Sequence, residues 1–130
     1  MAVKYFYTWE EFDKDVEELS AWARGRNFGG IYGIPRGGLV VAVALSHRLG
    51  LPLKLRPEEI DEDTLVVDDI SDSGKTLLEL EENIKIRPMA ATLFFHKDTK
   101  RMPDFFLRDK KEWVVFPWET DESSKYDNTF

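Results

Sequence analysis

Residues 65–76, with the sequence LVVDDISDSGKT, place three carboxylates directly before a turn whose composition suits phosphate. Asp68 and Asp69 end an apolar run, Asp72 follows them, and the SGKT segment at 73–76 opens an expected helix. Backbone N–H groups and the positive end of a helix dipole can bind a phosphate at such a position. Carboxylates repel phosphates. A site that holds both must therefore contact different parts of one ligand, or bridge them with a metal.

This segment is not a P-loop, although both motifs have Gly-Lys-Ser/Thr at the start of a helix. A P-loop has a glycine five residues before the glycine of its Gly-Lys pair. Asp69 occupies that position here, five residues before Gly74. The P-loop interpretation is therefore rejected.

The elements that position this segment are expected to alternate between strands and helices. Thr8 and Glu11 form a capping box before an amphipathic helix that ends near Gly25. Further along the chain, the sequence predicts strands over 29–34, 51–55, 64–67 and 90–95, helices over 39–49 and 76–84, and two late β-like runs at 104–107 and 113–116. This alternation predicts an α/β fold with a mostly parallel sheet.

A second turn, PRGG at residues 35–38, follows the first expected strand. In parallel sheets, ligands bind in the crevice beyond the carboxyl ends of the strands, where this turn and residues 68–76 both fall. Gly37 and Gly38 permit close approach of the backbone to a ligand, and Arg36 supplies a charged fork for phosphate oxygens. Both turns are therefore candidates for phosphate binding.

Residues 65–77 resemble the phosphoribosyl pyrophosphate (PRPP) signature of the type I phosphoribosyltransferases, which has an apolar run, an acidic pair and a following Asp-Ser/Thr-Gly-Thr turn. The likeness implies a three-layer α/β fold with helices flanking the central sheet. It also implies that the acidic pair faces the ribose and Mg²⁺, that the following turn binds the 5′-phosphate, and that Asp72 is the general acid or base beside purine N7. The implied PRPP- and phosphate-binding residues are Asp68, Asp69, Ser71, Asp72, Ser73, Gly74, Lys75 and Thr76. Of these, Asp68 and Asp69 would bind the metal. The implied pyrophosphate-binding residues are Arg36, Gly37 and Gly38.

The C-terminal segments FFHKD and PDFFLRDKKEWVVFPWE are similar to the 6-oxopurine branch of that family, the short bacterial and archaeal hypoxanthine, xanthine and guanine phosphoribosyltransferases. This similarity implies that Lys97 hydrogen-bonds the purine 6-oxo group, Trp113 stacks on the base, and the backbone of Val114 reads its edge. An ammonium donor favours an oxo group over the amino group of adenine. From the residues alone, a core role for Trp113 and a solvated position for Lys97 stay open, and Trp118 is expected in the core or an interface.

The composition restricts the class of protein further. The 130 residues fit one domain, 1–130, with 119–130 as an expected surface tail. A net charge of −7 argues against a nucleic-acid partner, and the absence of cysteine excludes disulfides and thiolate chemistry. The N-terminus lacks the apolar core of a signal peptide, and no apolar run approaches ~18 residues, so we expect a cytoplasmic protein without a membrane partner.

The expected function is transfer of the 5-phosphoribosyl group from PRPP to N9 of a 6-oxopurine in purine salvage. The expected partners are PRPP, a purine base or nucleoside monophosphate, and a second copy of the chain in a homo-oligomer, most simply a dimer. One feature departs from the family: only KLRPEEIDED, at 54–63, stands where a long lid loop usually closes over the reaction. Arg56 is the residue expected to reach a neighbouring site or the pyrophosphate. The short lid keeps open an alternative, a non-catalytic or regulatory PRPP- or nucleotide-binding protein of the same fold.

Overall fold

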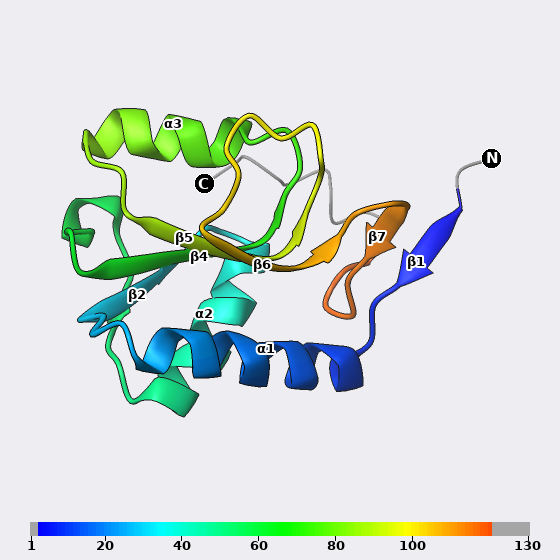
Figure 1. The fold of residues 1–130 in the computed structure, drawn as a ribbon, viewed down its shortest axis with the longest axis horizontal. Coiled ribbons are helices and arrows are strands. Elements are labelled where there is room, and N and C mark those ends of the chain that lie inside the picture. Colours follow the sequence, from blue (N-terminus) through cyan, green and yellow to red (C-terminus); the bar gives the residue numbers. More distant parts are fainter. Residues whose placement is uncertain (1–2, 121–130) are drawn as a thin grey trace.

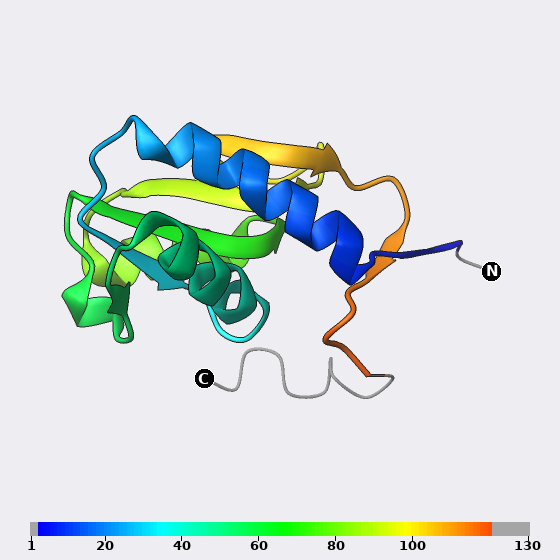
Figure 2. The ribbon, with the colours of Figure 1, turned by 90° about the horizontal axis from the view of Figure 1, so that it is seen from below.

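A five-stranded sheet forms the middle layer of this protein, with strand order β3-β2-β4-β5-β6. The computed structural model describes residues 3–120 (Figure 1). All neighbouring strands of this sheet are parallel. Helices α1 and α2 cover one face and α3 covers the other (Figures 1 and 2). The predicted α/β fold, with its parallel sheet between helical layers, is confirmed.

The element bounds follow the sequence pattern closely in most places. In chain order they are β1 (Lys4–Phe6), α1 (Trp9–Arg24), β2 (Gly30–Gly33), α2 (Gly37–Leu49), β3 (Leu53–Lys54), the 3-10 turn η1 (Pro57–Glu59), β4 (Thr64–Ser71), α3 (Lys75–Ile84), β5 (Met89–Phe95), β6 (Phe105–Asp109) and β7 (Trp113–Val115). Among the described residues, none of the helices combines the length and the apolar character that crossing a membrane requires. The expected surface tail at 119–130 lies outside the described residues apart from Glu119 and Thr120.

Helix α1 begins at the capping box that the sequence predicts. The Thr8 hydroxyl accepts a hydrogen bond from the Glu11 N–H, and the Glu11 carboxylate accepts one from the Thr8 N–H, both at 3.1 Å. These bonds satisfy two backbone donors that a helix start would otherwise leave without partners. At the end of α2, Gly50 adopts the left-handed conformation with φ 66° and donates to the Ser46 carbonyl, as its predicted C-cap role requires.

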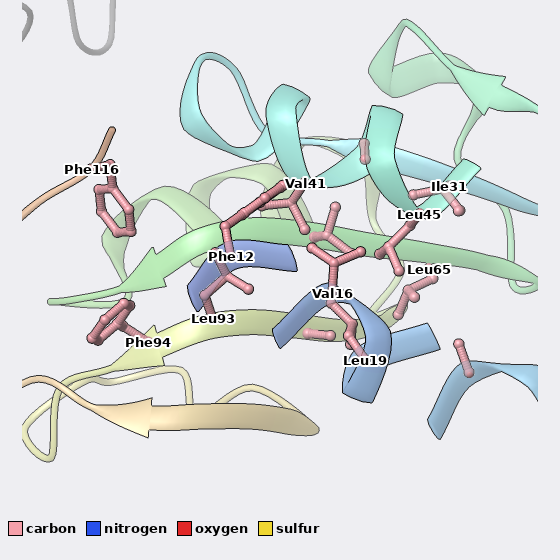
Figure 3. Packing of buried hydrophobic residues seen from close by; sticks show 14 of the residues in the cluster. Phe12, Val16, Leu19, Ile31, Val41, Leu45, Leu65, Leu93, Phe94 and Phe116 are labelled. Carbon is pink, nitrogen blue, oxygen red and sulfur yellow. The ribbon is translucent and has the colours of Figure 1, made fainter. Parts of the chain in front are cut away.

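The central strand β4 is apolar on both faces because helices cover both faces. Leu65 packs into the larger core cluster with residues of α1 and α2, such as Val16 and Leu45 (Figure 3). Val66 points to the opposite face and packs with Leu77 of α3. This burial accounts for the continuous apolar run of the strand. Where the apolar run stops, the acidic pair begins.

Strand β1 was not predicted, and it pairs with β7 in a separate two-stranded parallel sheet, which we call the small sheet. Lys4 pairs with Trp113, and Phe6 pairs with Val115. Several of the other expected bounds also differ, by one to four residues. The expected strand 51–55 is reduced to Leu53–Lys54, and the expected strand 64–67 continues to Ser71. Strand β4 continues past the acidic pair because β5 still pairs with it as far as Phe95.

Candidate active site

The two predicted turns meet at the carboxyl ends of β2 and β4, which are adjacent strands. They line one pocket of about 490 Å³. A Cβ atom on Gly37 would collide with the Asp69 carboxylate, and one on Gly38 would lie 2.6 Å from the Val67 carbonyl oxygen. Glycine at both positions therefore lets the PRGG turn lie directly against the acidic pair.

Most of the residues singled out in the sequence come together here. The pocket is lined by Arg36, Gly37, Asp68, Asp69, Ser71, Asp72, Ser73, Gly74, Lys75, Thr76, Trp113 and Val114, together with other residues. Gly38 is buried beneath the turn and is not part of the lining. Lys97 is exposed in the turn after β5 and is also outside the lining.

The turn at 73–76, which we call the phosphate turn, is shaped by Gly74, whose φ of 86° lies in the left-handed region. A Cβ atom there would stand 2.6 Å from the Arg101 backbone nitrogen, so close packing also requires glycine. Helix α3 starts at the next residue, Lys75, whose N–H donates to the Ser73 hydroxyl at 3.2 Å. The N-terminus of this ten-residue helix therefore opens into the pocket, where it can bind a phosphate.

The loop at 99–101 supports this turn through hydrogen bonds, and no local sequence pattern predicted it. The Lys100 N–H donates to the Ser73 carbonyl at 2.9 Å. Ser71, which is buried, hydrogen-bonds the Thr99 hydroxyl at 2.8 Å and donates to the Arg101 carbonyl at 2.9 Å. The hydroxyl of Ser71 is therefore engaged by the protein, and its carbonyl oxygen also accepts a hydrogen bond from the His96 N–H at 2.9 Å.

Arg101 fastens the same loop to α3. Its side chain is 2% exposed and forms an ion pair with Glu81 at 3.0 Å. The guanidinium also donates to the carbonyl oxygen of Pro88 at 3.3 Å. A buried arginine between a helix and a loop gives the turn a rigid support.

The acidic pair lies at the mouth of the crevice. One Asp68 oxygen accepts a hydrogen bond from the Asp69 N–H at 2.9 Å, and one Asp69 oxygen accepts from the Ile70 N–H at 2.8 Å. Thr92 of β5 pairs with Asp68 in register and lines the pocket. Its hydroxyl is buried and has no hydrogen-bond partner among the described residues.

Oxygen ligands suit Mg²⁺, and the donor set here fits a metal that arrives with its substrate. Within the described residues, no group of three or more His, Asp or Glu side chains could hold a metal ion. Mg²⁺ usually binds one or two carboxylates and takes its other ligands from water and substrate phosphates. Asp68 and Asp69 meet that requirement.

At the other end of the pocket, Trp113 is 55% exposed, whereas Val114 is buried. Lys110 was not among the predicted site residues, but it lies between Trp113 and Asp72. Its ammonium is 2.9 Å from an Asp72 carboxylate oxygen and 5.3 Å from the centroid of the Trp113 ring. Lys110 could have been found from the sequence by its position just after a β-like run, because that position lies at the same edge of the sheet as the other site residues. Trp118, expected in the core or an interface, stacks on Phe116 and also lines the pocket.

The short segment between β3 and β4 does not cover the pocket. None of residues 53–63 belongs to its lining. The side chain of Arg56 is 73% exposed and lies 4.0 Å from Glu58 of η1. The connection instead packs against α3. In a single chain, this side of the pocket is therefore open.

The sequence and the fold of this chain were compared with those of known proteins. No protein-family model matches the chain. It is 26% identical to the xanthine-guanine phosphoribosyltransferase of Idiomarina loihiensis, over 89% of this chain and 87% of the relative. The solved purine phosphoribosyltransferase from Pyrococcus horikoshii Ot3 superposes with a TM-score of 0.81 at 32% identity, over 90% of this chain and 94% of that one. The Helicobacter pylori xanthine-guanine-hypoxanthine enzyme gives a TM-score of 0.80 at 26% identity, over 95% and 98%.

Proposed function

The chain belongs to the type I phosphoribosyltransferases and is a purine phosphoribosyltransferase. From this premise we propose that it transfers the phosphoribosyl group of PRPP to a 6-oxopurine, which is guanine, xanthine or hypoxanthine. A bond forms between purine N9 and ribose C1′ while the bond from C1′ to pyrophosphate breaks. The products are a nucleoside monophosphate and pyrophosphate, as in purine salvage. The observation that carries this proposal is the single pocket in which a phosphate turn, an acidic pair and an exposed indole meet.

The phosphates of PRPP are assigned to the two turns. The 5′-phosphate would accept hydrogen bonds from backbone N–H groups of residues 73–76, where the start of α3 adds its positive dipole end. The pyrophosphate would lie against Arg36 and Gly37, with Gly38 supporting the turn from below. The contact between Gly37 and Asp69 supports this assignment, because it brings the pyrophosphate and ribose ends of one ligand side by side.

Asp68 and Asp69 would hold the ribose hydroxyls and Mg²⁺. When bound with PRPP, the metal would neutralise charge on the departing pyrophosphate. The carboxylates would also stabilise the positive charge that develops on an oxocarbenium-like ribose. In this proposal the carboxylates beside the phosphate turn bind the sugar and the metal, while the turn itself binds the phosphate.

The base would stack on Trp113 and present its edge to the backbone of Val114. Asp72 would accept the proton that the purine loses from N7 as N9 bonds to C1′. Its carboxylate lines the pocket and is 53% exposed, so a bound base would take the place of solvent around it. This exchange would bring the carboxylate and the purine edge together in a drier environment.

A substrate panel tests the proposal. Purified protein is given Mg²⁺ and PRPP with guanine, hypoxanthine, xanthine or adenine, and the nucleoside monophosphates are separated and quantified. We expect product from at least one 6-oxopurine, at a rate at least tenfold above that with adenine. PRPP binding without any nucleotide product would support the alternative of a non-catalytic binding protein. Adenine as the best substrate would contradict the choice of base.

A further inference from the structure

We propose that Arg101 is a positioning residue for the 5′-phosphate, because it fixes the place of the phosphate turn and so sets how tightly that turn binds a phosphate. The inference rests on the proposed function, since it concerns the phosphate end of the same pocket. Arg101 does not line the pocket, so it would act through the backbone of the turn and not by touching the ligand.

The loop at 99–101 meets the phosphate turn through backbone atoms. The Lys100 N–H donates to the Ser73 carbonyl at 2.9 Å. A Cβ atom on Gly74 would stand 2.6 Å from the Arg101 nitrogen and 2.9 Å from the Lys100 nitrogen. The two segments are therefore in direct contact, with no side chain of Gly74 between them. A shift of the loop would move the N–H groups of the turn that are proposed to bind the phosphate.

The guanidinium of Arg101 fixes where this loop lies. It donates to the two carboxylate oxygens of Glu81 in α3 at 3.0 to 3.2 Å. It also donates to the carbonyl oxygens of Met102 at 2.6 Å and Pro88 at 3.3 Å. One side chain therefore joins the middle of α3, the segment that leads from α3 into β5, and the loop itself. The Glu81 side chain is 10% exposed, so salt screens this pair only weakly.

Two carboxylates face the guanidinium. Besides Glu81, Asp104 lies 3.6 Å from it, and Asp104 is itself held by the Ala90 N–H of β5 at 2.8 Å. Without Arg101, these two carboxylates would lose the positive charge between them, and the nearly buried Glu81 would lose its partner. We expect the loop to leave α3 in that case, and the phosphate turn to lose its support.

This support matters for binding because several backbone N–H groups must point to one place to hold a phosphate. Donors that are already in position need no ordering when the ligand arrives, so less of the binding free energy is lost. The base end of the pocket is carried by other elements, β6 and β7. Arg101 should therefore influence the affinity for the phosphate of a ligand, and not the affinity for its base.

Three proteins test the inference: wild type, Arg101→Met and, as a matched control, Arg87→Met. Arg87 is exposed, follows α3 and does not line the pocket. For each protein, KM is measured for PRPP and for guanine, and GMP and guanosine, which differ only in the phosphate, are compared as inhibitors. In Arg101→Met we expect KM for PRPP to rise and inhibition by GMP to weaken by about tenfold or more, the equivalent of one charge-assisted hydrogen bond. KM for guanine and inhibition by guanosine should stay near the wild-type values, and Arg87→Met should behave as wild type.

The double variant Arg101→Met with Glu81→Leu separates positioning from stability if the single variant folds poorly. Removal of both charges of a buried pair often costs little stability, but the hydrogen bonds to the Pro88 and Met102 carbonyls are not restored. We therefore expect the double variant to regain melting temperature and to keep its raised KM for PRPP.

Three results would overturn the inference. They are an unchanged KM for PRPP in Arg101→Met, equal losses for PRPP and guanine, and a KM for PRPP that recovers together with the melting temperature in the double variant. A wild-type protein that neither makes nucleotide nor binds GMP would instead overturn the proposed function, and the inference with it.

Discussion

Arg108 and Asp15 are 93 residues apart in the sequence and are joined by two hydrogen bonds, at 2.6 Å and 3.3 Å. The pair ties β6 to α1. Asp15 also accepts a hydrogen bond from the Tyr7 hydroxyl at 2.5 Å. Tyr7 directly follows β1, so this cluster fastens the small sheet, which carries Trp113, to the rest of the protein.

Removal of the arginine should therefore be costly. We expect Arg108→Met to lower the free energy of unfolding by roughly 2–3 kcal/mol. This loss is smaller than that usual for a fully buried ion pair, because the Arg108 side chain is 31% exposed. Denaturant unfolding followed by circular dichroism measures the change. The matched control is Arg24→Met, whose pair with Glu17 is exposed and should contribute less than about 1 kcal/mol. Equal losses in the two variants would contradict the role of the cluster.

The Tyr7 phenol gives this cluster a pH dependence. Burial, and then the hydrogen bond to Asp15, raise the pKa of Tyr7 well above its usual value near 10. Above about pH 10 the unfolded chain loses the Tyr7 proton while the folded chain keeps it. The free energy of unfolding should therefore fall as pH rises, by up to about 1.4 kcal/mol per pH unit from this group. Chemical denaturation at a series of pH values from 9 to 11 should give a shallower fall in Tyr7→Phe. An identical slope in the variant would place the effect elsewhere.

Substitution of the acidic pair should weaken ligand binding and spare the fold. The double variant Asp68→Asn with Asp69→Asn keeps the side-chain shape at a strand end, but removes the charge proposed to hold Mg²⁺ and ribose. We expect calorimetry to show at least a tenfold loss of PRPP affinity in the presence of Mg²⁺, with little change in melting temperature. Glu62→Gln, on the exposed turn before β4, is the control and should bind as wild type. Unchanged affinity in the double variant would remove the pair from the site.

Gly74→Ala should damage the phosphate turn in two ways. The left-handed φ of 86° disfavours alanine, and the added Cβ would stand 2.6 Å from the backbone nitrogen of Arg101. We expect protection of the protein by 5′-monophosphates in thermal melting to be lost. Gly25→Ala adds the same atom in open space and should change neither binding nor stability substantially. If GMP still protects Gly74→Ala as well as wild type, the phosphate binds elsewhere.

The open side of the pocket leads to a prediction about assembly. If a second copy covers the site, turnover per subunit should fall when the protein is diluted below its dimer dissociation constant. Arg56→Ala should then reduce turnover as well, because Arg56 is the exposed cation of the short segment. Initial rates across a dilution series, alongside sedimentation measurements, test both points. A concentration-independent rate that is indifferent to Arg56 would show that one chain suffices without a lid.

The fold and the position of the turns at 35–38 and 73–76 could be predicted because their signals are local. The capping box at Thr8, the glycine at position 50 and the acidic run before Gly74 each dictate backbone geometry within a few residues. The small sheet could not be predicted, because Lys4 and Trp113 pair from opposite ends of the chain and neither strand exceeds three residues. The role of Arg101 could not be predicted for the same reason, because its loop at 99–101 follows β5 and contacts the phosphate turn only in the folded chain.

The base end was the hardest part to predict. Lys110 belongs to no motif in the sequence, and its position in the pocket depends on the path of the chain after β6. The contact between Lys110 and Asp72 became visible only once the two strands were in place.

The most direct test of the central claim is a ³¹P NMR time course of PRPP, Mg²⁺ and guanine with the protein. Loss of PRPP, formation of pyrophosphate and formation of GMP are followed in the same sample. The proposed reaction predicts that pyrophosphate and GMP appear in equal amounts, each matching the PRPP consumed. Pyrophosphate accompanied by ribose 5-phosphate without GMP, or no consumption of PRPP at all, would contradict it.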